Sequence, residues 1–381
     1  MRITALLLAA AGIAVFAADF KLPPPYHTPS ANNRPRVIPK PGDATLKVPD
    51  GFVAEKVADG FTQPRLMMYG PSKEILLSDS RGGIIWILEP ERRKLIENLD
   101  RPYGMAWWNG YLYVGETTSV KRYKYDAKKM TVGAGEEIFP MKDYGKGHWT
   151  RCLVFDRAGK KLYVGVGSGS NVDSGEPVDR AAVLQMNPDG SDKIIYASGT
   201  RNPTMIQWYP GTDVLWASVQ ERDALGDDLV PDYFTHIQKG GFYGWPDAYI
   251  GPNADPRRSE RPEMVIKTIV PDTLLGPHVA VIDFQFYTGK QFPKKYQGGA
   301  FLALHGSWNR SKRVGQSIGF IPFANGKPSG PIQNFLTGWM LGPDKQEVWG
   351  RPTGIMVKDD GSLLLSEDGN GTIWHVSYKG K

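Results

Sequence analysis

Short runs of β-branched and aromatic residues, separated by turn dipeptides, repeat along most of the chain after residue 50. The stretch AWWNGYLYVGE (106–116) is the clearest case, because Asn109-Gly110 supplies the positive-φ residues that a tight hairpin turn requires. Other strand–turn–strand units lie at 66–79, 154–167, 208–219 and 355–368, with third strands at 82–88 and 371–376. Helical periodicity is almost absent. The pattern therefore predicts an all-β domain.

A recurring polar stretch stands ahead of the first strand of these units. These stretches contain Gln63-Pro64-Arg65, Arg101-Pro102, His148-Trp149-Thr150-Arg151, Arg201-Asn202-Pro203 and Arg351-Pro352. A sixth, less regular unit covers 279–308. Repeats of three or four strands at intervals of roughly 40–75 residues are typical of propeller blades. We therefore expect a six-bladed β-propeller, and a β-sandwich ranks second because it would not repeat this motif.

Equivalent positions in the blades of a propeller converge on its central axis, because the innermost strand of every blade lines the channel. The expected ring consists of Gln63, Arg65, Arg101, His148, Arg151, Arg201, Asn202 and Arg351. Facing arginines repel one another unless an anion lies among them. The alternative for any one arginine is a Pro-containing turn with the guanidinium in solvent. The shared repeat position favours a site for a small, flat ligand with several negative charges.

Composition and charge narrow the function classes. The 381 residues are 41% hydrophobic, which excludes a wholly disordered chain. The net charge of +6 arises from 46 basic and 40 acidic residues without a Lys/Arg run, so nucleic acid is not an expected partner. Cys152 is the single cysteine, which excludes an intramolecular disulfide, and no C-x-x-C-H motif for attached haem is present.

The first 49 residues differ from the rest. Residues 1–17 have an early positive charge, an apolar stretch and small residues, which predicts a cleaved signal peptide, and an uncleaved membrane anchor is the alternative. Residues 18–49 are proline-rich and are expected to form an extended tether ahead of a catalytic propeller at 50–381. The prediction is a periplasmic or secreted protein with no membrane insertion after cleavage.

An acidic loop interrupts the repeat at 219–251. It carries Glu221, Asp223, Asp227, Asp228 and Asp232. Clustered oxygen donors in a glycine-containing loop suit calcium, although the spacing is not that of an EF-hand. The alternative is a solvated acidic loop without a metal.

Five motifs in a fixed order carry a family likeness. They are HWTR (148–151), GTRNP (199–203), ERDALGDDL (221–229), GGFYGWP (240–246) and GRPTGI (350–355). In this order they resemble the soluble pyrroloquinoline-quinone-dependent sugar dehydrogenases, most closely the sorbosone and aldose sugar dehydrogenase branch, over about residues 50–378. The resemblance implies a six-bladed propeller with a flat tricarboxylate quinone at the top of the channel. It also implies a calcium ion that polarises the quinone, and an aldose or related sugar oxidised at C1 by hydride transfer.

The same resemblance implies roles for individual residues. His148 matches the general base, and Arg201 matches a residue that contacts the cofactor and stabilises the developing oxyanion. The other implied cofactor-binding residues are Asn202, Arg351, Arg65 and Lys312, with Arg310 and Arg313 as alternatives to Lys312. The implied metal-binding positions are Arg222 and Asp223, where glucose-oxidising relatives have Gly-Pro, followed by Asp227 and Asp228.

Electrons would leave to a separate acceptor, a cytochrome c or a quinone, because the chain has no haem motif and no flavin or nicotinamide fingerprint. Two other readings stay open. A calcium-dependent lactonase would need carboxylate and amide ligands around an axial metal, and a non-catalytic propeller would bind a protein or glycan on its face.

Overall fold

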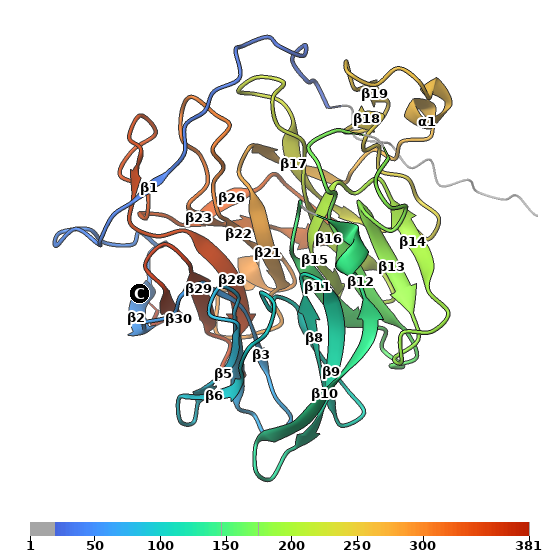
Figure 1. The fold of residues 1–381 in the computed structure, drawn as a ribbon. Helices are drawn as coiled ribbons and strands as arrows, with labels where there is room; N and C mark the ends of the chain where they lie inside the picture. Colours follow the sequence, from blue (N-terminus) through green and yellow to red (C-terminus); the bar gives the residue numbers. More distant parts are fainter. Residues whose placement is uncertain (1–19, 146, 174, 381) are drawn as a thin grey trace, which may run out of the picture.

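The fold is a ring of β-sheets with almost no helix, and the computed structural model describes residues 20–145, 147–173 and 175–380 (Figure 1). The expected signal peptide lies outside the described residues. Among those described, no helix is long and apolar enough to cross a membrane.

Six four-stranded antiparallel sheets form the blades, which confirms the six-bladed propeller expected from the sequence. The first blade consists of β3 (Pro64–Tyr69), β4 (Ile75–Asp79), β5 (Ile84–Glu89) and β6 (Arg93–Ile96). The second consists of β7 (Met105–Trp108), β8 (Tyr111–Glu116), β9 (Ser119–Asp126) and β10 (Thr131–Pro140). The third consists of β11 (Arg151–Phe155), β12 (Leu162–Val166), β13 (Ala182–Met186) and β14 (Ile194–Ser198).

The other three blades complete the ring. The fourth blade consists of β15 (Asn202–Trp208), β16 (Leu215–Gln220), β17 (Pro231–His236) and β20 (Thr273–Pro277). The fifth consists of β21 (Val281–Phe286), β22 (Ala300–Leu304), β23 (Ser317–Ile321) and β26 (Gln333–Leu336). The sixth consists of β28 (Pro352–Val357), β29 (Leu363–Glu367), β30 (Thr372–Tyr378) and β2 (Phe52–Ala58). In the last blade the outer strand comes from near the start of the domain, since β2 pairs with β30. This pairing closes the ring, because the last blade takes its outer strand from the segment that leads into the first blade.

Small elements lie outside the blades. They are the strand pairs β1 (Arg36–Val37) with β27 (Glu347–Val348), β18 (Ala248–Tyr249) with β19 (Asn253–Ala254) and β24 (Phe323–Ala324) with β25 (Lys327–Pro328), the helix α1 (Pro262–Ile266), and the 3₁₀ turns η1 (Lys142–Tyr144) and η2 (Lys294–Tyr296).

The hairpin read from Asn109-Gly110 forms as expected. These two residues connect β7 to β8 and have φ values of 46° and 78°. Both values are positive, as the two-residue turn between strongly twisted strands requires.

Apolar side chains between neighbouring blades hold the ring together. Trp216 of β16 is 1% exposed and stacks on Phe234 of β17, with ring centroids 4.9 Å apart. Phe284 of β21, in the next blade, meets the same Phe234 edge-on at 4.7 Å. Aromatic pairs of this kind contribute about 0.5–1.5 kcal/mol beyond their buried area. The blades are therefore packed as rigid layers that fix the positions of the channel residues.

Residues 26–38 form an extended segment, which we call the N-terminal strap. In Figure 1 the strap is the blue trace that passes over one face of the ring before it reaches β1. Its β1 pairs in parallel with β27, and Ile38 packs against the apolar cluster of the fifth and sixth blades. This part of the proline-rich region lies against the propeller.

Candidate functional site

A polar cavity of about 590 Å³ opens where the innermost strands begin. Its walls come from the first residues of β3, β15 and β21, from the residues just before β11 and β28, from the loops around 220–223 and 305–308, and from the strap. Its charged and histidine side chains are Arg34, Arg65, His148, Arg201, Glu221, Asp223, Asp232, His278, His305 and Arg351. The cavity thus lies on the channel axis, at the end where the repeated polar stretches meet.

His148 precedes β11 and presents one free ring nitrogen. Its Nδ1 lies 2.9 Å from the carbonyl oxygen of Ser168. A carbonyl can only accept, so Nδ1 carries the proton and Nε2 keeps its lone pair. Burial, reinforced by the charge of Arg201, lowers the pKa of His148 to about 3. His148 is therefore a neutral imidazole at pH 7, and its Nε2 makes no hydrogen bond to the part of the chain that the structure describes.

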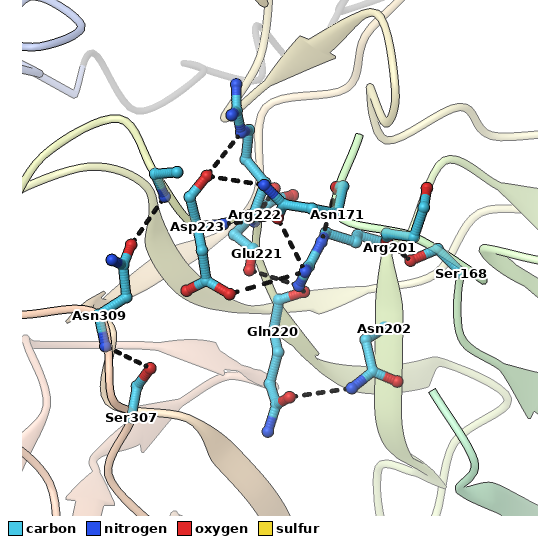
Figure 2. A network of polar contacts seen from close by, with 12 residues as sticks. Ser168, Asn171, Arg201, Asn202, Gln220, Glu221, Arg222, Asp223, Ser307 and Asn309 are labelled. Atoms are coloured by element: carbon cyan, nitrogen blue, oxygen red, sulfur yellow. Dashed lines mark hydrogen bonds and ion pairs between the residues drawn. The ribbon is translucent and has the colours of Figure 1, made fainter. Parts of the chain in front are cut away.

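Arg201 is fixed by a network that Figure 2 shows. Its Nη1 donates to the carbonyl of Glu221 at 2.6 Å, and its Nε and Nη2 donate to the main chain and side chain of Asn171 at 3.1 and 3.0 Å. The carboxylate of Asp223 lies 3.9 Å away. A buried guanidinium held at this many points is a preorganised positive charge, which is what stabilisation of a developing anion requires.

The pKa values of the three carboxyl groups in the cavity are shifted in different directions. Burial raises the pKa of Glu221 to about 8, and Glu221 Oε1 has no partner among the described residues. Burial also raises the pKa of Asp232 to about 6, although the N–H groups of Glu221 and Val281 hydrogen-bond to it. Although burial opposes ionisation of Asp223, the hydrogen bond from His278 and the charge of Arg201 lower its pKa.

A second group of charges lies across the cavity around Asp368 of the sixth blade. Its two carboxylate oxygens bind Arg65 Nη2 at 2.7 Å and His305 Nε2 at 2.8 Å. Arg351 donates to the carbonyl oxygens of His305 and Gly306, at 3.3 and 2.6 Å. Burial and the charge of Arg351 lower the pKa of His305 to about 4. Arg65 and Arg351 are thus held in place as fixed cations.

Several buried polar atoms of the cavity lack a partner within the described chain. They are Arg65 Nε, Thr150 Oγ1, Asn202 Oδ1 and Glu221 Oε1. Leaving such atoms unpaired costs about 1–3 kcal/mol each, so their gathering in one cavity indicates a polar ligand. The arginines make the site favour an anionic ligand. The indole of Trp149, beside Arg65, offers a flat apolar wall.

The structure brings together five members of the expected ring. Arg65, His148, Arg201, Asn202 and Arg351 all line the cavity. Three other members lie elsewhere. Arg151 is buried behind the site and donates to the carbonyls of His148 and Thr150, and Gln63 binds Asp368 from outside the lining. Arg101 is exposed, with its guanidinium 5.5 Å from the ring centre of Trp149.

Lys312 is not brought to the cavity. Its side chain is 71% exposed, and its ammonium lies 4.0 Å from Asp344. Of the two alternatives, Arg310 pairs with Asp228 at 2.7 Å and Arg313 binds the strap at Asn33. None of the three faces the site, because the loop that follows β22 turns toward the strap.

The positions implied for the metal are engaged within the protein. Arg222 forms a buried ion pair with Asp255 at 2.6 Å, and Asp227 and Asp228 bind Ser311 and Arg310. The carbonyl of Asp223 accepts from Asn171 and Arg222. Among the described residues no three His, Cys, Asp or Glu side chains gather as a metal cage. The loop therefore does not present the free oxygen set that calcium takes up.

Sequence reasoning missed four contributors to the cavity, which are His278, His305, Trp308 and Arg34. His305 lies in the irregular sixth unit and His278 directly precedes it, and no repeated polar motif marks the strand start there. The two arrive from before β21 and after β22, so only the antiparallel pairing of these strands places them at the same end of the channel. Arg34 comes from the strap, which carries no periodic signal.

Comparison with known proteins agrees with this geometry. The family model of Glucose / Sorbosone dehydrogenase matches residues 108–307, more than half of the chain, and a TrAA12-like model matches 262–379. An uncharacterized protein of Borreliella burgdorferi is 28% identical over 352 residues, covering 88% of this chain and 92% of its own. A pyrroloquinoline quinone-dependent pyranose dehydrogenase of Coprinopsis cinerea is 26% identical over 204 residues, which are 49% of this chain but only 24% of that protein.

Solved structures share the fold at lower identity. The calcium structure of a Trichoderma reesei Carbohydrate-Active Enzymes Family AA12 protein superposes with a TM-score of 0.76 at 20% identity, covering 87% of this chain and 97% of that one. The PQQ-bound aldose sugar dehydrogenase of Streptomyces coelicolor gives a TM-score of 0.62 at 18% identity, covering 88% and 99%. Together with the family match, these results show that the chain belongs to the glucose/sorbosone dehydrogenase family.

Proposed function

We propose that this protein is an exported oxidoreductase that uses pyrroloquinoline quinone to oxidise an aldose or related sugar at C1. The observation that carries the proposal is the cavity itself. It combines a neutral histidine with a free Nε2, the buried Arg65 and Arg201, the half-buried Arg351 and unpartnered polar atoms at one end of a propeller channel. The family membership supports the same activity class.

The buried cations suit a flat tricarboxylate. Arg65, Arg201 and Arg351 would bind the carboxylates of the quinone, and Asn202 Oδ1 and Glu221 Oε1 would receive hydrogen bonds from its donor atoms or from the sugar. Because these arginines are already oriented by Asp368, Asn171 and main-chain carbonyls, little side-chain entropy is lost on binding.

His148 would act on the sugar hydroxyl. Its Nε2 takes the C1 hydroxyl proton while the Nδ1–H bond to Ser168 keeps the ring in the basic tautomer. Arg201 stabilises the negative charge that develops on the sugar oxygen. Bound quinone would supply the two-electron acceptor, and a separate acceptor, a cytochrome c or a quinone, would reoxidise the protein.

Calcium has a smaller role in the proposal. The carbonyls of Glu221 and Asp223 and the carboxylates of Asp227 and Asp228 are engaged within the protein, and no step of the reaction is assigned to a metal. Reconstitution in EDTA, compared with reconstitution in calcium, measures whether the ion is needed.

The decisive experiment is reconstitution. Purified protein is given pyrroloquinoline quinone and assayed with a redox dye and a panel of aldoses. We expect dye reduction with some of them. Tight quinone binding with no dye reduction on any sugar would contradict the dehydrogenase, and lactone hydrolysis by a protein that does not bind the quinone would indicate the hydrolase instead. The mass of the mature N-terminus in the exported fraction checks the signal peptide.

Two variants test the cofactor assignment. Arg351→Gln removes a half-buried cation that lines the cavity, so quinone affinity should fall about tenfold or more. Lys312→Gln removes an exposed cation that faces away, so affinity should stay unchanged. Titration by fluorescence quenching measures both. Equal losses in the two variants would remove Arg351 from the cofactor site.

A further inference from the structure

The strap is fastened on both sides of the cavity mouth. On one side, Tyr26 N donates to the carbonyl of Leu225 at 2.8 Å, and Thr28 Oγ1 accepts from the N–H of Asp227 at 2.8 Å. On the other side, β1 pairs with β27 of the loop before the sixth blade. The segment between these anchors crosses the face on which the cavity opens.

The middle of the strap is held most tightly, at Asn33. Its amide donates to the carbonyls of Arg310 and Ser311 at 3.1 and 2.8 Å. Its main-chain N–H donates to the carbonyl of Trp308 at 2.7 Å, and Arg313 donates to both of its oxygens. These bonds on Asn33 fix the main chain at the position next to Arg34.

Arg34 differs from the other arginines of the cavity. Arg65, Arg201 and Arg351 are deep in the site and each donates to fixed protein oxygens. Arg34 lines the cavity from its exposed rim, and its guanidinium has no hydrogen bond or ion pair to any residue in the ranges that the structure describes. A cation at the rim of the cavity without a partner among the described residues is available to a ligand.

An aromatic surface stands beside Arg34. Trp308 lines the same cavity, and 38% of its side chain is exposed, which is unusual for an indole. The carbonyl of Trp308 is bonded to Asn33, so the indole and Arg34 belong to one connected rim. An exposed indole face packs well against the C–H face of a pyranose ring.

We propose that Arg34 and Trp308 form an outer subsite for a sugar that carries a carboxylate or phosphate. Trp308 supports the sugar ring and Arg34 binds the anionic group, while the ring's C1 end enters toward His148. The inference rests on the proposed function for the direction of entry, and it deepens that function by naming the substrate class. Because Arg34 is exposed at the rim, we assign it to the sugar. The arginines that lie deep in the site are assigned to the cofactor.

The test compares acidic and neutral aldoses in the reconstituted protein and its Arg34→Gln variant. The probes are D-glucuronate, D-glucose 6-phosphate and D-glucose. Arg34→Gln should raise KM for the two anionic sugars about fivefold, leave D-glucose unchanged and leave kcat nearly unchanged, with the difference shrinking as salt is added. Lys40→Gln is the matched control, because Lys40 lies on the same N-terminal region but does not line this cavity.

A binding measurement separates this inference from the dehydrogenase proposal. Calorimetric titration of D-glucuronate into quinone-free protein should show binding that Arg34→Gln weakens and Lys40→Gln does not. If no sugar reduces the dye but this binding is observed, the subsite stands and the dehydrogenase fails.

Two results would overturn the subsite. One is an equal effect of Arg34→Gln on acidic and neutral sugars. The other is weakened quinone binding in Arg34→Gln, which would make Arg34 a cofactor residue. Asn33→Ala, which releases the strap without removing the charge, should reproduce the KM change at constant kcat, and an unchanged KM would contradict the positioning role of Asn33.

Discussion

The two ends of the propeller channel have cavities of nearly equal volume and opposite character. The cavity at the strand starts measures about 590 Å³ and is lined by arginine, histidine and carboxyl groups. The cavity at the strand ends measures about 580 Å³ and is lined mainly by apolar side chains, including Met67, Met68, Met105, Met205 and Met356. Five innermost strands run between the two cavities, and β7 contributes only to the apolar one, so the difference comes mainly from which residues stand at each end.

This comparison indicates that the polar end of the channel serves the reaction and the apolar end serves stability. On β21, Ile282 faces the polar cavity while Gln285 and Phe286 face the apolar one. Asp283 lies between them, fully buried, with Oδ2 accepting from the N–H of Ile355 at 2.7 Å. A change at the polar end is therefore expected to alter turnover, and a change at the apolar end to alter folding.

The largest expected effect concerns His148. His148→Asn can keep a bond to the Ser168 carbonyl but has no basic nitrogen, so turnover of the reconstituted protein should fall by about 10²–10⁴-fold while quinone binding persists. Steady-state dye reduction and quinone titration measure the two quantities. Met205→Leu at the other end is the control and should keep full turnover. An active His148→Asn variant would remove the functional contrast between the two ends.

A smaller effect is expected at the apolar end. Met356 is 4% exposed and packs in the cluster between the first and sixth blades. Met356→Ala should lower the free energy of unfolding by about 2 kcal/mol, near the low end for such truncations because one side already faces a cavity. Denaturant unfolding measures the loss, and turnover per folded molecule should not change. A loss of turnover at unchanged stability would show that the apolar end takes part in the reaction.

The smallest expected effect lies between the two ends, at Asp283. Burial raises its pKa to about 8 from 3.8, so the folded state holds a proton that the unfolded chain releases. This stability contribution is complete below pH about 4 and is lost as the pH rises to about 8. Asp283→Asn should therefore stabilise the folded protein at pH 8 and change its stability little at pH 4. Thermal melts across this range measure the change, and an equal effect at both pH values would contradict a buried neutral carboxyl group.

Much of this architecture is predictable from the sequence, because it depends on patterns of neighbouring residues. Hairpin turns such as Asn109-Gly110 require special φ values, and alternating strands recur at blade spacing. The repeated polar motif also identifies Arg65, His148, Arg201 and Arg351, since repetition converts a sequence position into a position on the axis. Local sequence patterns are therefore sufficient to predict the number of blades and about half of the residues that line the cavity.

The rest depends on contacts that no local pattern encodes. Arg151 has the same motif position as its neighbours, yet it turns behind His148 because its guanidinium finds two main-chain carbonyls there. His305 reaches the site from the far end of β22, and Asp368 from the loop after β29, through strand pairing. Lys312 is a cofactor-binding residue only by family resemblance, and the bonds of its loop to the strap direct it to solvent.

The closure of the last blade has a consequence for folding. Since β2 pairs with β30, the sixth blade is completed by two strands from distant parts of the sequence, and joining them carries a loop-closure entropy that no other blade meets. Such non-local pairing is slow compared with hairpin formation, so ring closure should be a late step that follows folding of the individual blades. The strap and β27 belong to this same late assembly. The mouth of the cavity is therefore finished only when the whole domain has folded, and a partly folded chain has no complete site.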